Sequence, residues 1–354
     1  MPPVAKKHLR FEAWPEEDRA IFLVVFQDGD PFGEESRAAH MSAATRIGLR
    51  AAHARFLGFL TSEDPYRLRL PPDARVDRES VRAFVEHLRR SCRDTSIAST
   101  LHKLRLFLGL ICAEKDWSWL KIIAKRIAAQ ATPKLDPSQG ITSAMLFALG
   151  IQLMAEAENS ACVAGRITKE DALTYRDGMI IALLAAVPLR KRTFAALTIN
   201  QHLVKVGSGW LLDIPAADTK TRRALEFPIP DALSDSMNLH LTMFRTAIPG
   251  ANRHQALWPS AKGRPMRGGA IYDAVRRRTF ERFGLAVNLH RFRGAAGNLW
   301  SISDPKNVRG AKDLLGHTGF GTTERHYIAA QSRLAGRAFA KVLRHEVRAD
   351  RTRV

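Results

Sequence analysis

A short stretch of turn-forming residues divides the sequence into two runs of helical pattern. Residues 132–141, "TPKLDPSQGI", contain two prolines and a glycine and few apolar side chains. Because proline and glycine interrupt regular structure, this composition is typical of a linker. On both sides of it, apolar residues recur at helical spacing over most of the 354 residues. The pattern predicts two domains built mainly from helices.

The first domain is expected to be entirely helical and to span residues 42–131. Four segments of this range place apolar residues on one helical face: 42–60, 77–92, 95–116 and 118–131. Residues 1–41 are interpreted as an N-terminal appendage, with a short amphipathic helix over 16–26 followed by a turn-rich stretch.

The second domain is expected over residues 142–335 and to be mixed in structure. It opens with helical patterns and then shows the one convincing strand signal, over residues 202–230, where two or three short strands are separated by turn residues. Residues 336–354 are interpreted as an amphipathic helix that runs into a basic tail.

The charge of the chain favours a polyanionic partner. Lys and Arg number 55 against 35 Asp and Glu, which gives a formal net charge of +20. Such a balance suits nucleic acid, although a basic protein without that partner is the alternative. The three cysteines, Cys92, Cys112 and Cys162, are scattered and form no zinc-binding pattern or disulfide framework, so a reducing compartment is expected.

No segment predicts export or membrane insertion. The N-terminus has no apolar core typical of a signal peptide. The most apolar run, "GMIIALLAAV" at 178–187, is too short to span a bilayer and predicts a buried helix. We therefore expect a cytoplasmic protein.

Arg190 is the first candidate for chemistry. It follows Pro188, where the apolar helix must end, so its guanidinium can be held rigidly and aimed outward. A planar guanidinium binds phosphate through two parallel hydrogen bonds. The plainer interpretation is a surface arginine beside Lys191 and Arg192.

Further candidates follow in the second domain. Lys220 lies on a hairpin turn, where it could reach a ligand and donate a proton, or serve only solubility. His290 and Arg293 are three residues apart and would share a helical face. His317 follows Leu-Gly, where the glycine could equally be a helix C-cap, and Tyr327 comes ten residues later.

Together and in this order, these residues resemble the signature of the tyrosine recombinase (phage integrase) family. The candidate catalytic residues are Arg190, Lys220, His290, Arg293, His317 and Tyr327. The resemblance extends over about residues 42–335 and implies a helical, SAM-like core-binding domain that binds DNA. The catalytic domain that follows it would be mostly α-helical, with a small antiparallel β-sheet.

The resemblance implies transesterification of a DNA phosphodiester. Tyr327 would be the nucleophile and form a 3′-phosphotyrosine, His290 would assist as a base, and Lys220 would protonate the departing 5′ oxygen. A phenol with a pKa of about 10 needs such activation at neutral pH.

Charge on the non-bridging phosphate oxygens would be stabilised by Arg190 and Arg293, with a hydrogen bond from His317. The linkage conserves bond energy, so no cofactor and no metal are expected. The implied partners are double-stranded DNA, further copies of the chain in a tetramer, and accessory DNA-bending proteins. No membrane partner is expected, and the location would be the nucleoid. The implied process is integration or transposition of a mobile element.

Two positions depart from the family pattern. Thr193 stands where a glutamate is usual, and ten residues separate His317 from Tyr327 instead of the usual nine. These departures leave open an accessory DNA-binding protein with impaired catalysis. A type IB topoisomerase, which uses similar chemistry, is the other alternative.

Overall fold

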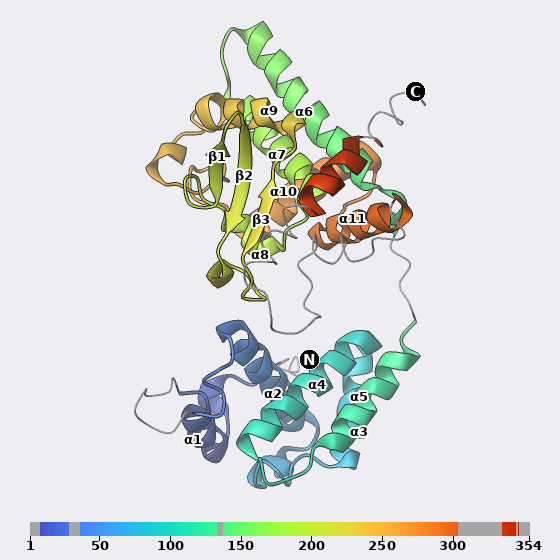
Figure 1. Cartoon of the computed structure of the whole chain (residues 1–354). Coiled ribbons are helices and arrows are strands. Elements are labelled where there is room, and N and C mark those ends of the chain that lie inside the picture. The colour runs from blue at the N-terminus through green and yellow to red at the C-terminus, as the bar shows by residue number, and fades with distance from the viewer. Residues whose placement is uncertain (1–7, 28–35, 133–136, 304–334, 345, 347–354) are drawn as a thin grey trace. The chain divides into compact units, whose positions relative to one another are not determined.

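The computed structural model divides into two compact units, Met1–Lys134 and Leu135–Val354 (Figure 1). It describes residues 8–27, 36–132, 137–303, 335–344 and 346. The boundary between the units falls within the stretch 132–141. The described residues are mostly helical and contain one three-stranded antiparallel sheet, which confirms the predicted fold class.

All regular elements among the described residues of the first unit are helices. Its elements are η1 (Phe11–Ala13), α1 (Glu16–Val25), α2 (Ala43–Glu63), η2 (Pro65–Arg69), α3 (Arg78–Arg89), α4 (Asp94–Ile111) and α5 (Ser118–Gln130). One apolar core joins these helices, and Phe56, Phe84 and Phe107 at its centre are completely buried. The α3 helix begins with a capping box, in which Asp77 and Ser80 satisfy each other's backbone N–H groups.

The interpretation of residues 1–41 as an appendage is wrong for residues 9–26. Trp14 and Val25 belong to the core of the first unit. Asp18 on α1 is fully buried, where it contacts His53 Nε2 at 2.7 Å and pairs with Arg75. Because these partners lie on α2 and before α3, α1 is fastened to the domain by contacts that sequence periodicity does not reveal.

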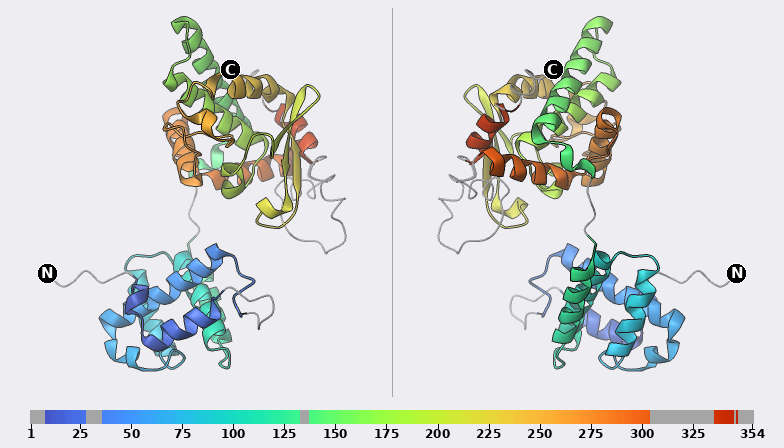
Figure 2. Two further views of the ribbon diagram at one scale, coloured as in Figure 1. Left: turned by 90° about the vertical axis from the view of Figure 1, so that its left-hand side faces the viewer. Right: turned by 90° about the vertical axis from the view of Figure 1, so that its right-hand side faces the viewer.

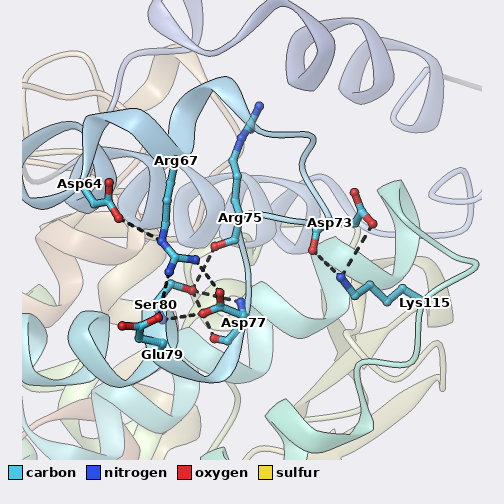
Figure 3. A network of polar contacts seen from close by, with 8 residues as sticks. All are labelled: Asp64, Arg67, Asp73, Arg75, Asp77, Glu79, Ser80 and Lys115. Carbon is cyan, nitrogen blue, oxygen red and sulfur yellow. Dashed lines mark hydrogen bonds and ion pairs between the residues drawn. The ribbon is translucent and has the colours of Figure 1, made fainter.

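A second polar network closes the connection between α2 and α3 (Figure 3). Arg67 lies at its centre and contacts the carboxylates of Asp64 at 2.9 Å, Asp77 at 2.6 Å and Glu79 at 3.3 Å. Asp77 also caps α3, so one guanidinium fixes both the η2 turn and the start of the next helix.

The second unit combines helices with the sheet. Its helices are η3 (Pro137–Gly140), α6 (Ser143–Ala164), α7 (Lys169–Ala186), α8 (Lys191–Ala195), η4 (Ala216–Asp218), η5 (Asp231–Leu233), α9 (Ser234–Leu239), η6 (His240–Phe244), η7 (Ala251–Arg253), α10 (Gly268–Phe283) and α11 (Leu289–Ser303). Its strands are β1 (Leu203–Val206), β2 (Gly209–Ile214) and β3 (Leu225–Pro228). The strands lie in the order β1-β2-β3, and Leu212 on β2 pairs with Leu203 and Phe227 on its neighbours.

Helices α6 and α7 form the centre of this unit and approach each other at two glycines. A methyl group on Gly150 would lie 2.6 Å from the carbonyl oxygen of Gly178, and one on Gly178 would lie 2.7 Å from that of Gly150. Only glycine permits backbones to come this close. The contact buries α7 from Met179 to Ala186, as the apolar run predicted.

The helical segment 335–344, here called the C-terminal helix, packs within its own unit beside the sheet (Figure 2). Phe339 is fully buried and stacks on Trp300 of α11, with ring centroids 6.2 Å apart. Gly336 lies against Phe227 and Pro228 of β3. Within the described part of the chain, no helix combines the length and apolar character needed to cross a bilayer.

Candidate active site

The turn after α7 presents Arg190. Pro188 follows the buried helix and has no N–H with which to continue the helical hydrogen bonds. Arg190 then occupies the N-cap position of α8 and is half-buried. A buried helix therefore ends four residues before Arg190.

Arg293 on α11 reaches the same turn. Its Nη1 atom donates a hydrogen bond of 2.6 Å to the carbonyl oxygen of Pro188, and only 8% of the residue is exposed. Burial lowers the pKa of Arg293 to about 10, and the positive charge of Arg190 contributes to the same shift. The two guanidinium groups therefore lie close enough for their charges to repel each other, an arrangement that suits a bound anion.

Further contacts fix the orientation of α11. Arg291 donates from Nε to the carbonyl oxygen of Ser138 at 3.0 Å and from Nη2 to that of Ile141 at 3.3 Å. His290 lies on the same helix as Arg293, as their spacing predicted, but its side chain is exposed. The helix thus places a buried arginine and an exposed histidine one turn apart.

The turn that carries Lys220 is tied to α8. Thr193, the residue that stands where glutamate is usual in the resembled family, donates from Oγ1 to the carbonyl oxygen of Asp218 at 3.3 Å. Lys220 follows two residues later, between η4 and β3, and is exposed. Within the turn, Thr219 Oγ1 accepts a hydrogen bond of 2.9 Å from the backbone N–H of Arg223.

The structure thus brings together Arg190 and Arg293, and joins the turn of Lys220 to the helix that Arg190 caps. His317 and Tyr327 lie outside the described residues. Within the described ranges, no group of three His, Cys, Asp or Glu side chains is arranged to hold a metal ion.

The sequence interpretation missed an aromatic and cationic cluster beside Arg190. The Nζ atom of Lys191 lies 5.9 Å from the centre of the Tyr272 ring, and the Arg276 guanidinium lies 5.3 Å from it. The spacing of four between Tyr272 and Arg276 on a helix was a visible signal for half of this cluster. Lys191 joins it from a different element, which spacing alone could not predict.

It also missed a buried carboxylate that joins α7 to α10. Asp177 accepts hydrogen bonds of 2.6 Å from Arg176, 2.9 Å from Arg277 and 3.2 Å from Arg278. Arg176 also donates to the carbonyl oxygen of Pro259 at 2.8 Å. This network therefore fastens α10 to α7, the helix that leads into Arg190.

Comparison with known proteins finds likenesses among solved structures. No protein-family model matches the chain, and no curated protein matches it significantly. Among solved structures, the chain is similar to the XerA recombinase at 15% sequence identity, over 89% of this chain and 94% of that chain, with a TM-score of 0.35. The function is therefore argued from the residues of this chain.

Proposed function

We propose that the chain cleaves and rejoins DNA strands as a tyrosine-type site-specific recombinase. The observation that carries the proposal is the convergence of Arg190 and Arg293 on the turn after α7. Two like charges held together in a partly buried place favour an anion with several oxygen atoms, and a phosphodiester meets that description. The net charge of +20 extends the same preference to a long polyanion.

The proposed first step forms a bond between Tyr327 Oη and the phosphorus atom and breaks the bond from phosphorus to the 5′ oxygen. His290 takes the phenolic proton, and Lys220 gives a proton to the 5′ oxygen. Arg190, Arg293 and His317 stabilise the charge that gathers on the non-bridging oxygens. The free 5′-hydroxyl of another strand reverses the step and joins the DNA in a new arrangement.

A covalent adduct between protein and DNA tests this chemistry directly. The full-length chain is incubated with duplexes from the DNA that flanks its gene, each nicked so that the cleaved strand is released. We expect an adduct with the wild type and none with Tyr327→Phe, which keeps the ring but lacks the nucleophilic oxygen. Tyr66→Phe is the matched control, because Tyr66 is 75% exposed and lies in the first unit. An adduct that persists in Tyr327→Phe, or one absent from the wild type on all such DNA, would contradict the proposal.

The same assay separates the two alternatives. An accessory protein with impaired catalysis would bind DNA without forming an adduct. Thr193 supports this alternative, because its hydroxyl donates to a backbone carbonyl oxygen at a position where the resembled family usually has a glutamate. A topoisomerase would form the adduct and relax supercoiled DNA, but it would exchange no strands between two duplexes. Strand exchange supports a recombinase, and sequencing of the joined products identifies the DNA site.

A further inference from the structure

Asp218 fastens the turn that carries Lys220 by both its backbone and its side chain. Its carbonyl oxygen accepts the hydrogen bond from Thr193 described above, and its Oδ2 atom lies 3.1 Å from His202 Nε2. His202 precedes β1 and is 4% exposed, whereas the Asp218 side chain is 40% exposed. A buried imidazole therefore reaches out to a carboxylate at the base of an exposed turn.

The contacts of His202 fix which of its ring nitrogens carries the proton. Its Nδ1 atom accepts a hydrogen bond of 3.1 Å from the backbone N–H of Thr198, and a backbone N–H can only donate. The proton of the neutral ring is therefore on Nε2, from where it is donated to Asp218. The backbone of His202 is also anchored, because its carbonyl oxygen accepts from the N–H of Asp213 on β2 at 2.8 Å.

The segment beyond Asp218 has little freedom of its own. Thr219 closes it through hydrogen bonds with Arg223, and Arg222 has a φ of 50°, in the left-handed region. The hydrogen bonds within the turn hold its residues together, and Asp218 attaches the turn to the rest of the unit. The positions of Asp218 and of β3, at the two ends of this turn, therefore set where the flexible side chain of Lys220 can reach.

We propose that His202 is a positioning residue for Lys220: by holding Asp218, it keeps the turn where Lys220 can protonate the departing 5′ oxygen. This inference rests on the proposed function, because it assigns Lys220 a proton-transfer role. The competing view is that His202 and Asp218 only stabilise the fold near the sheet.

The first test measures the turn itself and needs no enzymatic activity. The turn contains three sites for trypsin, after Lys220, Arg222 and Arg223. We expect His202→Asn to be cut there several times faster than the wild type, because its shorter amide cannot reach Asp218. His202→Gln, whose amide nitrogen replaces Nε2, should be cut at nearly the wild-type rate. Cuts elsewhere in the chain serve as the internal reference for each variant.

The second test asks whether the turn matters for the leaving group. Single-turnover cleavage is compared on ordinary DNA and on DNA with a bridging 5′ sulfur, which leaves as a thiolate and needs no proton. On ordinary DNA we expect His202→Asn and Asp218→Ala to lose about tenfold in rate, since general acid catalysis supplies at least that much. On the sulfur substrate both should approach the wild-type rate, and His202→Gln should be nearly normal on both. The exposed Asp218 side chain makes Asp218→Ala the variant of choice if His202→Asn does not fold.

The outcomes distinguish this inference from the proposed function. A wild type without an adduct refutes the function, while the trypsin result still reports whether His202 holds the turn. If the wild type is active and trypsin cuts the turn of His202→Asn at the wild-type rate, the inference is overturned. An equal loss of rate on both DNA substrates overturns it too, because that is the behaviour of a general loss of stability.

Discussion

Arg293 Nη1 donates to the carbonyl oxygen of Pro188 at 2.6 Å, so a residue of α11 is bonded to the turn two residues before Arg190. This hydrogen bond fixes Arg293 to the turn that carries Arg190, although the two arginines are separated by 103 positions in the sequence. The positive charge of Arg190 also contributes to the lowered pKa of Arg293, so the two side chains lie close together. Each arginine should therefore be replaced individually, both by a residue without charge and by one that keeps the charge.

Arg293→Ala should lower the single-turnover cleavage rate by about a hundredfold or more, because it removes donors aimed at the developing negative charge. Arg293→Lys should recover only a small part of that rate, since an ammonium group cannot bond to Pro188 and grip phosphate with two parallel hydrogen bonds. Arg253→Ala, at an exposed position on η7, is the control and should cleave normally. Rates within tenfold of wild type for Arg293→Ala would remove this residue from the site.

The packing of α6 on α7 predicts a large effect from a small substitution. In Gly178→Ala the added methyl group would meet the carbonyl oxygen of Gly150, a backbone atom that cannot move aside alone. We expect a loss of about 1–3 kcal/mol in the stability of the second unit, as for an overpacked core. Hydrogen exchange at the amides of α7 measures this loss within the full chain.

Gly269→Ala provides the matched control for that experiment. Gly269 lies on α10 in the same unit, and a methyl group there would have no neighbour within 4 Å. Alanine is the better helix former, so this change should leave stability unchanged or raise it slightly. Equal effects of the two substitutions would show that helix propensity, and not the close approach of the helices, governs both.

Several parts of the fold were predictable from local pattern. Apolar periodicity predicted the helices, and the turn residues between 202 and 230 predicted a small sheet, because both signals depend on neighbours in sequence. The place of α1 was not predictable, since the burial of Asp18 depends on His53 and Arg75, which lie 35 and 57 residues away. Because the sequence does not show these partners, a charged helix at the N-terminus is interpreted as an appendage.

The candidate site likewise contains residues that the sequence indicated and contacts that it could not indicate. Arg190 could be singled out because a proline ends a buried helix just before it, and Arg293 because of its spacing from His290. Their proximity could not be predicted from composition, and neither could the bond between His202 and Asp218, which joins two elements across a hairpin. His317 and Tyr327 remain predictions from motif order.

The buried triad of the first unit predicts a dependence of stability on pH. Burial lowers the pKa of His53 below 6.5, an effect that Asp18 opposes and Arg75 reinforces. Its Nδ1 atom is buried with no hydrogen-bond partner among the described residues, so a proton there would be both unsatisfied and close to Arg75. The pKa of His53 is therefore lower in the folded unit than in the unfolded chain, which takes up the proton more readily.

It follows that this histidine stabilises the folded unit fully above pH 6.5, and that the contribution is lost as the pH falls below that value toward the lowered pKa. Asp18 has a different window: its hydrogen bonds with His53 and Arg75 outweigh burial and lower its pKa below 3.8, so its contribution is lost only in stronger acid. Between pH 7 and pH 5, hydrogen exchange at the amides of α2 should therefore report His53.

His53→Gln is the informative variant, because it keeps an N–H donor for Asp18 but does not titrate. We expect its stability to vary less between pH 7 and pH 5 than that of the wild type, whatever its absolute value. The exposed His102 in the same unit is the control, and His102→Gln should retain the wild-type slope. An unchanged slope in His53→Gln would mean that other groups cause the pH dependence.

The last prediction concerns the packing of the C-terminal helix. In the structure, Phe339 is fully buried against Trp300 of the same chain. Phe339→Ala should therefore destabilise the second unit by about 3–5 kcal/mol, the usual cost of emptying an aromatic position in a core. Thermal unfolding of the isolated chain at low concentration measures this loss. Lys341→Ala, an exposed change on the same helix, should leave the melting temperature nearly unchanged. If Phe339→Ala melts like the wild type but assembles poorly on DNA, the helix contributes to contacts between subunits instead.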